Sequence, residues 1–468
     1  MGAKTFSNEL KNTLQKLRAQ ARAIIDHAIE AVDPFTCVRG VIGVEREDLV
    51  APGLSPEYRI DLSRIDSVYV VGCGKAGARM SLAVEQVLGN RIVDGAVAIK
   101  YGHRASSDPR RIKLYEAGHP RPDENGRLAA QQAMALLDKA GPRDLVIALL
   151  SGGGSALWPL PVEGISLNDK RKTTEALLRC GATIHEINCV RKHLSAIKGG
   201  FAALHAAPAR VLALVISDVI GNDLDAIASG PFVGDPTTFA DAVSILKRYE
   251  LMDRVPAPVL SHITQGADGN RRETPKPGDP AFSQVKHLLC ADNDLALHAA
   301  AEKAAALGFR VVRWPQPLCG ESQHAAEKFC GKALSLLAAS REPFALIAGG
   351  ETTVTLGDAG GTGGRNQEFA LAASQLVNGS DMLVIASCGT DGTDGPTDAA
   401  GGMIDATTCS RGAAIDLDIR THLDHHDSYH FLKKTGDLIV SGPTGTNVMD
   451  LQLALGVPRD CEKMRNIE

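Results

Sequence analysis

Residues 68–80, VYVVGCGKAGARM, have the pattern of a buried strand that runs into a glycine-rich loop and then into a helix. Gly72, Gly74 and Gly77 have the G-x-G-x-x-G spacing of a dinucleotide-binding loop, and Lys75 stands between the second and third glycine. Backbone N–H groups at a helix N-terminus, together with one ammonium group, form a site for an anion. The stretch therefore predicts a β-loop-α unit that binds a phosphate or a carboxylate.

A dinucleotide site also needs an acidic residue about 20 positions further on, at the end of the second strand, to bind the ribose hydroxyls. Asp94 has nearly this spacing, but it precedes the predicted strand at 95–99, and Lys100 follows that strand. A P-loop requires Gly at Tyr69 and Ser or Thr at Ala76, so that motif does not match either. The residues favour an anion-binding loop that suits a phosphate or a carboxylate, and a nicotinamide site is the alternative.

Along the rest of the chain, short apolar runs alternate with helical segments, which is typical of parallel sheets covered by helices. Strands are predicted at 67–71, 95–99, 145–150, 211–216, 286–290, 310–313, 344–348 and 382–386. Helices are predicted at 78–88, 126–140, 169–184, 294–307, 322–339 and 366–377. A polar stretch rich in proline, residues 254–284, interrupts this pattern. We therefore expect two α/β domains, residues 1–265 and 280–468, around a cleft.

Composition excludes several classes of protein. Of the 468 residues, 44% are hydrophobic and 22% are charged, values typical of a globular chain. The formal net charge of −5 and the 4% of aromatic residues argue against a nucleic-acid or membrane-surface partner. No apolar stretch is long enough to span a membrane. Small-molecule substrates, and a monomer or homodimer, are expected.

The cysteines and the predicted N-terminal helix indicate in which cellular compartment the protein is expected. Ten scattered cysteines include no C-x-x-C pair, and without a secretory signal they indicate a reducing, cytoplasmic compartment. Residues 7–32 predict an amphipathic helix. Glu9, Asp26 and Glu30 suit a mitochondrial targeting helix poorly, so we expect this helix to pack on the first domain.

Four further loops follow predicted strands and are rich in Gly, Ser, Thr or Asp. They are SGGGSA at 151–156, SDVIGND at 217–223, GGETTVTL at 349–356 and SCGTDGTDGPTDAAG at 387–401. In the first loop, three glycines allow the backbone to surround an anion, and two serines offer hydroxyl donors. A serine-hydrolase elbow is not favoured, because Leu157 stands where that motif requires its last glycine.

The charged residues of these loops suit phosphoryl transfer, which needs Mg²⁺ held by one or two carboxylates and a carboxylate that orients the attacking hydroxyl. Aspartates in glycine-rich turns also commonly cap helices, and this remains the alternative for at least half of them. Arg365 follows glycines at a predicted helix start, where its fork of donors suits an oxyanion. The stretch DHHDSYH at 424–430 predicts a surface turn before a helix near Tyr429 rather than a metal site.

Nine motifs in this order resemble the glycerate 2-kinase family of the MOFRL type, whose members often carry the name hydroxypyruvate reductase. Besides the five loops above, the matching stretches are GHPRPDENG at 118–126, INCVRKHLSAIKGG at 187–200, GGRNQEFALAAS at 363–374 and DLIVSGPTGTNVMDL at 437–451. The resemblance implies two Rossmann-like domains with mainly parallel sheets flanked by helices and an active site in the interdomain cleft, the second domain being of the MOFRL type. It also implies ATP-dependent phosphorylation of D-glycerate to 2-phosphoglycerate with a divalent cation; the alternative is an NAD(P)H-dependent hydroxypyruvate reductase.

The resemblance places the family's lysine at Lys75 and its arginine at Arg365. Asn222, Phe232 and Met449 depart from the residues usual in the family, and Asn222 bears on which acid of its loop meets the metal. The expected catalytic residues are Lys75, Asp218, Arg365 and Asp394, and the expected metal ligands are Asp223 and Asp391. The expected substrate- and phosphate-binding residues are Gly74, Ser151, Gly152, Gly153, Gly154, Ser155, Arg191, Lys198, Glu351 and Asn366.

Overall fold

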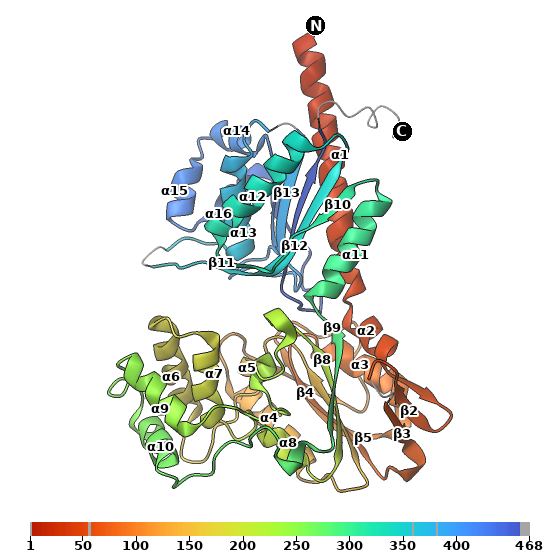
Figure 1. Ribbon diagram of the computed structural model, residues 1–468, viewed down its shortest axis with the longest axis vertical. Helices are drawn as coiled ribbons and strands as arrows, with labels where there is room; N and C mark the ends of the chain where they lie inside the picture. Colours follow the sequence, from red (N-terminus) through yellow and green to blue (C-terminus); the bar gives the residue numbers. More distant parts are fainter. Residues whose placement is uncertain (1, 55–57, 358–359, 381, 459–468) are drawn as a thin grey trace. The chain divides into compact units, whose positions relative to one another are not determined.

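The computed structural model describes residues 2–54, 58–357, 360–380 and 382–458, and Figure 1 shows its helices and strands. The chain forms two compact units. Pro34–Ala291 make up the first, called the N-terminal unit below. Met1–Asp33 and Asp292–Glu468 together make up the second, called the C-terminal unit. Each unit has its own sheet and its own hydrophobic core.

The N-terminal unit is built on a six-stranded sheet in which every pairing is parallel. Its strands are β4 (Val68–Cys73), β5 (Ile92–Lys100), β6 (Lys113–Ala117), β7 (Leu145–Leu150), β8 (Arg210–Ile216) and β9 (Val285–Ala291). Their order in space is β6-β5-β4-β7-β8-β9. Counted along the chain this is 3-2-1-4-5-6, the order of a doubly wound Rossmann sheet. The order reverses between β4 and β7, and ligands of such sheets bind beyond the strand ends at this point.

Helices cover both faces of this sheet because its strands are continuous apolar runs; β7, for example, is buried along its whole length. The helices packed around the sheet are α2 (Pro34–Val41), α3 (Gly77–Leu88), α4 (Glu124–Leu137), α5 (Gly154–Leu157) and α8 (Phe201–Ala206). A small antiparallel sheet of β1 (Gly43–Glu45), β2 (Asp48–Ala51) and β3 (Tyr58–Asp61) adjoins them.

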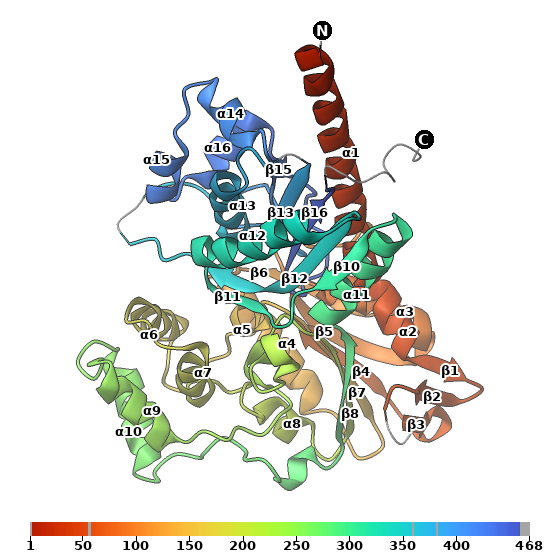
Figure 2. The same cartoon turned by 45° about the horizontal axis from the view of Figure 1, so that its top comes forward.

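Four further helices of the N-terminal unit form a separate cluster, seen beside the sheet in Figures 1 and 2. They are α6 (Leu167–Arg179), α7 (Ile184–His193), α9 (Phe239–Arg248) and α10 (Ala257–Ala267). Three of them begin with a capping box, at Ser166, Thr183 and Thr238, in which an acidic side chain three residues later bonds back to the cap. The predicted helix at 169–184 ends earlier, at Arg179, and a second helix begins at Ile184 after the Thr183 cap.

The C-terminal unit contains a seven-stranded mixed sheet with the order β10-β12-β16-β13-β14-β15, and β11 also pairs with β12. The strands are β10 (Arg310–Arg313), β11 (Leu318–Glu321), β12 (Phe344–Thr353), β13 (Leu383–Gly389), β14 (Gly401–Asp405), β15 (Leu438–Ile439) and β16 (Asp450–Gly456). The helices are α1 (Gly2–Ala31), α11 (Asn293–Ala306), α12 (Ser322–Ala339), α13 (Arg365–Leu376), α14 (Thr408–Ala413), α15 (Ile419–Asp424) and α16 (Ser428–Thr435).

Two helical layers sandwich this second sheet. Phe344, Leu346 and Ala348 of β12 pack in one core cluster with α12 and α13, whereas Ala345 and Ile347 pack in another with α1 and α11. Alternate residues of one strand therefore serve opposite layers, as strand geometry requires.

All eight predicted strands are present, and the predicted mainly parallel character is confirmed for the first sheet, in which every pairing is parallel. In the second sheet two of the six pairings are parallel and four are antiparallel. Two of the antiparallel pairings arise because β16 inserts between β12 and β13 and runs against both. The other two arise because β14 runs against β13 and β15. Hydrophobic runs give the position of a strand but not its direction.

The two units also differ from the predicted division into residues 1–265 and 280–468. Strand β9 follows the proline-rich stretch, yet it pairs in parallel with β8 and completes the first sheet. The expectation that the N-terminal helix packs on the first domain is wrong, because α1 lies in the C-terminal unit with Leu17, Ile24 and Ala28 in its core. The expected cleft between domains stays a prediction.

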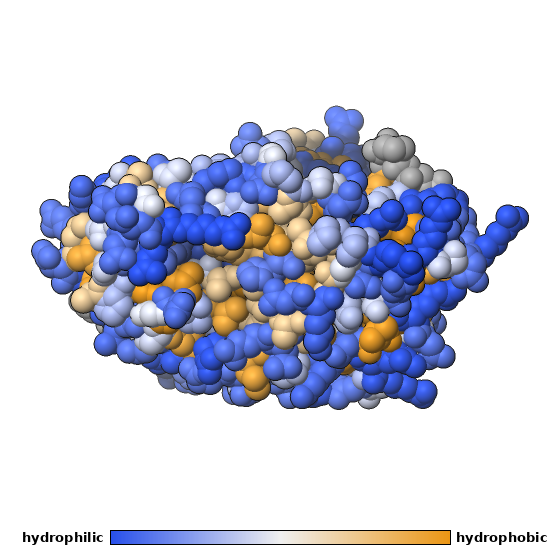
Figure 3. Space-filling model, turned by 90° about the horizontal axis from the view of Figure 1, so that it is seen from below, coloured by the Kyte–Doolittle hydropathy of each residue, from blue (hydrophilic) through white to orange (hydrophobic). Residues whose placement is uncertain are grey.

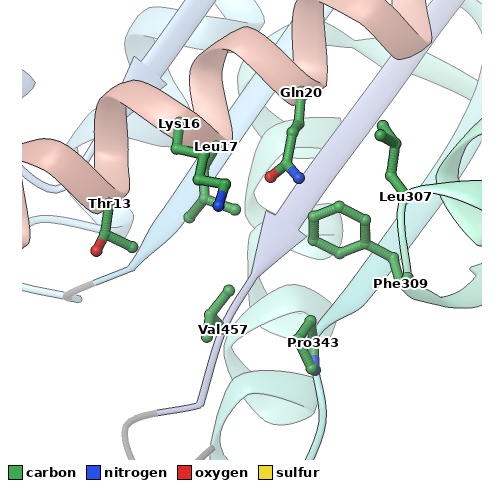
Figure 4. Close-up of a pocket in the computed structure, with 9 residues that line it drawn as sticks. Thr13, Lys16, Leu17, Gln20, Leu307, Phe309, Pro343 and Val457 are labelled. Carbon is green, nitrogen blue, oxygen red and sulfur yellow. The ribbon is translucent and has the colours of Figure 1, made fainter. Parts of the chain in front are cut away.

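A small cavity lies where α1 meets the residues around Phe309 and Pro343, and Figure 4 shows its lining. Its volume is about 20 Å³, enough for a single water molecule and too small for a substrate. In the part of the chain that the structure describes, no helix is long and apolar enough to cross a membrane. On the face in Figure 3, hydrophobic side chains are interspersed with hydrophilic ones.

Candidate active site

The loops after β4 and β7 meet at the point where the strand order of the first sheet reverses. Lys75 N donates a hydrogen bond to Gly152 O (2.8 Å), and Ala76 N donates one to Ser151 Oγ (3.1 Å). Gly74 has φ of 140°, and a Cβ atom there would overlap Ser151 Oγ and lie 2.6 Å from Ser151 O. Only glycine fits this position, so the two glycine-rich loops form one interlocked backbone surface.

Lys75 lies over the second of these loops. A Cβ atom on Gly153 would lie 3.5 Å from Lys75 Cγ and 3.0 Å from His119 Cδ2. His119 precedes Pro120 in the loop between β6 and α4. The structure thus brings the side chains of Lys75 and His119 close to the backbone of Gly153, an arrangement that suits the binding of an anionic substrate.

A series of hydrogen-bonded polar side chains leads from the same loop to α7. Ser155 and Ser229 exchange a hydroxyl hydrogen bond of 2.7 Å, and Ser229 Oγ donates to Asn188 Oδ1 at 3.0 Å. Ser229 and the preceding Ala228 have φ of 61° and 52°, a left-handed conformation that non-glycine residues rarely adopt. Lys198 Nζ donates a hydrogen bond to Ala228 O (3.0 Å) and so stabilises the turn formed by Ala228 and Ser229.

The basic residues of VRKHLSAIKGG have different surroundings. Lys192 is buried and paired with Asp225 and with Asp235, so its charge is neutralised within the protein. Arg191 and Lys198 instead line a cavity together with Ser155. Burial lowers the pKa of Arg191, and it lowers the pKa of Lys198 to about 8. These two residues have the surroundings expected for anion binding, whereas Lys192 has a structural role.

The acidic loop after β8 lies at the same edge of the sheet, because β8 runs parallel to β7. Asp218 is partly exposed and Asp223 is exposed. Asp223 Oδ1 accepts a hydrogen bond from Asp225 N (3.0 Å), a turn-capping contact that leaves its other oxygen outside this bond. Asn222, which replaces the family's usual aspartate, has φ of 57°, a conformation that asparagine tolerates.

The second group of predicted residues surrounds Arg365 at the start of α13. Arg365 Nε and Nη2 donate to the two oxygens of Asp450 at 2.6 and 2.8 Å, and Arg365 Nη1 lies 2.8 Å from Glu351 Oε1. Asp450 is fully buried. Burial alone lowers the pKa of Arg365, but the charge and hydrogen bonds of Asp450, and then Glu351, raise it well above its usual value. The guanidinium is firmly charged and held between two carboxylates.

Asp394 caps the same helix. One of its oxygens accepts from Asn366 N (3.2 Å), and the other accepts from Gln367 N (2.9 Å). A Cβ atom on Gly364 would overlap the Asp394 carboxylate, which explains the glycine there. Burial raises the pKa of Asp394 to about 6, the backbone bond from Gln367 opposes this, and the charge of Asp450 adds to it.

Asn366, which was expected to bind the substrate, has a buried side chain. Asn366 Oδ1 accepts from Ser387 Oγ (2.6 Å), and its Nδ2 lies 3.4 Å from Asp394 Oδ1. Asp391 is also buried, and its Oδ1 accepts from Thr393 N (3.0 Å). Asn366, Asp391 and Asp394 therefore all take part in holding the loops of the C-terminal unit together.

No group of three or more His, Cys, Asp or Glu side chains within residues 2–54, 58–357, 360–380 and 382–458 is arranged to hold a metal ion. A nucleotide-bound Mg²⁺ needs only one or two carboxylates, since phosphate oxygens and waters complete its shell. The exposed Asp223 and the partly exposed Asp218 fit this requirement better than Asp394, both of whose oxygens accept hydrogen bonds.

The histidine-rich stretch forms a turn before α16, which begins at Ser428, as predicted. His426 contacts the buried Glu368 (Nδ1 to Oε1, 2.9 Å), and Gln323 Nε2 donates to the same oxygen (2.7 Å). His426 is thus a hydrogen-bond partner of the buried Glu368 carboxylate.

Sequence reasoning missed three residues. Asp450, Lys170 and His119 stand beside Arg365, Lys198 and Lys75 respectively. Asp450 and His119 lie within motifs that the resemblance identified, so an acid at the start of an apolar run and a histidine in a proline-rich loop were available signals. Lys170 lies in an ordinary amphipathic helix and gives no such signal.

Comparisons with known proteins agree with this architecture. Residues 20–264 match the family described as "Domain of unknown function (DUF4147)", and residues 344–450 match the MOFRL family. The chain is 43% identical over 436 residues to a glycerate 2-kinase from Pyrococcus horikoshii, covering 92% of this chain and 96% of that protein. It is 40% identical over 453 residues to a D-glycerate 2-kinase from Thermotoga maritima, covering 94% and 99%.

A solved structure supports the same conclusion. The crystal structure of a glycerate kinase from Thermotoga maritima is similar with a TM-score of 0.79 at 40% identity, covering 95% of this chain and 100% of that one. The sheet topology, the interlocked glycine loops and these similarities over nearly the full length lead to one assignment. The chain belongs to the glycerate 2-kinase family of the MOFRL type.

Proposed function

We propose that the protein is an ATP-dependent kinase that phosphorylates D-glycerate at its 2-hydroxyl group to give 2-phosphoglycerate and ADP. The observation that carries the proposal is the similarity to glycerate 2-kinases at 40–43% identity over more than nine tenths of the chain. The interlocked loops around Gly74 and Ser151, with Lys75 above them, supply the anion-binding backbone that a nucleotide phosphate requires.

Catalysis would then rest on positioning and charge neutralisation, as phosphoryl transfer generally does. Lys75 neutralises charge on the transferred phosphoryl group, and the backbone of Gly152, Gly153 and Gly154 binds phosphate oxygens. Asp218 is the candidate for orienting the 2-hydroxyl group. Mg²⁺, when bound, lowers the negative charge of the triphosphate, and Asp223 is its candidate ligand.

Arg365 has a supporting role in this proposal. It already bonds to Asp450 and Glu351, so a substrate carboxylate that reaches it must share or displace the exposed Glu351. Asp394 positions Arg365 by capping the helix on which Arg365 stands. We further propose that the enzyme is cytoplasmic, and a monomer or homodimer is the expected assembly.

The alternative, a nicotinamide-dependent hydroxypyruvate reductase, has little support. Its name occurs on relatives from Agrobacterium vitis, one of them 42% identical over 82% of this chain. In the sheet, Asp94 lies near the start of β5, and Lys100 ends that strand at the ligand edge. The acid that binds the ribose of a dinucleotide is therefore absent from its usual place in this strand.

One assay separates the two activities. Purified protein is incubated with ATP, Mg²⁺ and D-glycerate, ADP formation is coupled to NADH oxidation, and 2- and 3-phosphoglycerate are resolved by chromatography. We expect glycerate-dependent ADP and the 2-phosphate, and we expect EDTA to abolish both. Absence of ADP together with NADH oxidation on hydroxypyruvate alone would refute the kinase and favour the reductase.

A further inference from the structure

A cavity of about 390 Å³ lies wholly within the N-terminal unit, beside the loop after β7. Its size is that of a small-molecule site and corresponds to roughly a dozen water molecules. Its polar lining includes Ser155, Lys170, Arg191 and Lys198, and its apolar lining includes Pro159 and Leu178. Ser155 belongs to the glycine-rich loop that interlocks with the Lys75 loop, so the cavity adjoins the proposed active site.

Lys170 is a residue of this cavity to which neither the sequence motifs nor the proposed mechanism assigns a role. It lies on α6, it is 7% exposed, and its Nζ has no hydrogen-bond partner among the residues that the structure describes. A buried ammonium group without a partner is costly, because water is removed and nothing replaces it. Such a group is retained where a ligand of opposite charge supplies the missing bonds.

The charges around the cavity do not balance within the protein. Arg121, Lys170, Arg171, Arg191 and Lys198 line it, with Glu175 as the acidic residue of the lining. Arg171 is engaged with the carbonyl of Pro122 and holds the loop before α4 in place. Lys198 bonds to a backbone carbonyl rather than to a carboxylate. Lys192 on the neighbouring helix α7 differs from Lys170, because it is paired with two carboxylates and has a structural role.

We propose that this cavity is the oxyanion subsite of the kinase, in which Lys170 joins Arg191 and Lys198 to bind the carboxylate or phosphate group of a substrate. The proposal rests on the kinase function and adds a binding residue and a place to it. Ser155, whose hydroxyl bonds to Ser229 Oγ, lines the cavity and joins it to the glycine-rich loop after β7. Charge-assisted hydrogen bonds from these side chains to an oxyanion are stronger than bonds between neutral groups.

Protonation behaviour supports this assignment. Burial lowers the pKa of Lys170 well below its usual value, and the charges of Lys198 and Arg191 lower it further. Arg121, Arg171 and Glu175 are the other charged groups of the lining. An incoming anion favours the charged ammonium, so binding takes up a proton wherever Lys170 is neutral in the free protein, and the affinity falls as the pH rises.

The test is calorimetric titration of the whole protein with three probes: inorganic tripolyphosphate, a non-hydrolysable MgATP analogue and D-glycerate. Lys170→Met removes the buried charge at nearly constant volume, and Lys172→Met makes the same change at an exposed position of the same helix. We expect Lys170→Met to weaken at least one probe about 10- to 100-fold and to reduce proton uptake, whereas Lys172→Met binds like the wild type.

The pattern across the probes identifies the bound group. Loss of tripolyphosphate and nucleotide binding assigns the cavity to phosphate, and loss of glycerate binding alone assigns it to the carboxylate. Wild-type affinity of Lys170→Met for all three probes overturns the proposal. If Lys170→Met does not fold, Leu178→Glu decides instead, since Leu178 lines the cavity at 59% exposure, where a new carboxylate repels an anion without disturbing the core.

Failure of this inference is distinguishable from failure of the kinase function, because titration needs no turnover. If the wild-type protein forms ADP from glycerate and ATP, and Lys170→Met has unchanged Michaelis constants for both substrates, the kinase function is supported and the proposed subsite is refuted. If the wild-type protein has no kinase activity, the proposed function is refuted. Tripolyphosphate binding that depends on Lys170 would still identify an oxyanion site.

Discussion

The two units handle charge in opposite ways around their glycine-rich loops. In the N-terminal unit, Lys170, Arg191 and Lys198 gather at one cavity, and burial together with mutual repulsion lowers the pKa of Lys170. In the C-terminal unit, Arg365 is held between Asp450 and Glu351, and burial raises the pKa of Asp394. One region has surplus positive charge, and the other has surplus buried acid.

This difference shows that a basic residue in a glycine-rich motif is not automatically a binding residue. A cation with carboxylate partners must give one up before it binds an anion, whereas a cation without them gains bonds when the anion arrives. The N-terminal unit is therefore prepared for negatively charged substrates, and the C-terminal unit holds a rigid arginine. Four changes test this contrast.

The largest effect is expected from Lys75→Ala. If the N-terminal loops receive the phosphates, loss of this ammonium lowers kcat/KM about 100- to 1000-fold, since it removes a charge that stabilises the transition state. Steady-state kinetics with ATP and D-glycerate measure the effect, and Lys139→Ala, an exposed lysine of the same unit, is the control. Undiminished turnover in Lys75→Ala would exclude a catalytic role for this residue.

Gly74→Ala should follow, with a loss of about 3 kcal/mol in the free energy of unfolding of the N-terminal unit. The added methyl group overlaps Ser151 and forces the two loops apart. Gly102→Ala is matched to it, because Gly102 also has positive φ (74°) but nothing within 4 Å of its Cβ position; it should cost only about 1 kcal/mol. Equal losses in urea denaturation would contradict the interlocking of the loops.

Asp450→Asn tests the opposite region. It leaves the partly buried Arg365 with one exposed carboxylate, so the C-terminal unit should lose about 2 kcal/mol of stability. Asp424→Asn breaks an exposed ion pair with Arg420 and should cost less than about 1 kcal/mol. The chain has two tryptophans, Trp158 in one unit and Trp314 in the other, so fluorescence of a Trp158→Phe background reports the C-terminal unit. A loss no larger than that of the control would show that Asp450 is not the principal partner.

The smallest effect is a pH dependence of stability with opposite signs in the two units. The pKa of Asp394 is about 6 in the fold, above its usual value, so the native state binds more protons than the unfolded chain between about pH 4 and 6. Stability of the C-terminal unit should fall as the pH rises through this range, with a slope of at most about 1.4 kcal/mol per pH unit. The pKa of Lys198 is lowered to about 8, so the contribution of this residue to the stability of the N-terminal unit should rise with pH above 8.

Urea midpoints followed separately by Trp158 and Trp314 check both slopes. Asp394→Ala should flatten the first slope and leave the second unchanged. Slopes of the same sign in the two units would contradict the difference in charge on which the comparison rests.

Much of the fold was predictable because its signals are local. The eight apolar runs became strands, and Gly74 and Ser151 stand in loops after strands as expected. The positions of β14 and β16 were missed, since antiparallel strands buried among others carry no distinctive period. The division into units was read from the proline-rich stretch, but the pairing of β9 with β8 and the packing of α1 depend on distant residues.

The candidate site divides in the same way. Lys75, Arg365 and the four acidic positions were identifiable from their loops, yet Lys192 and Lys198 are indistinguishable along the chain. Only the fold gives one of them two carboxylates and the other a cavity. Lys170 and Asp450 act through neighbours brought from elsewhere in the sequence.

The sequence by itself determined the family, the presence of glycine-rich loops after apolar strands, and the residue types available for phosphate chemistry. These are properties of short segments, where backbone preference and hydrophobic pattern act locally. The tertiary structure alone decided which loops interlock, which strand runs antiparallel and which charges remain to be neutralised by a ligand. Those depend on side chains far apart in the chain, whose desolvation and pairing arise only when the chain folds.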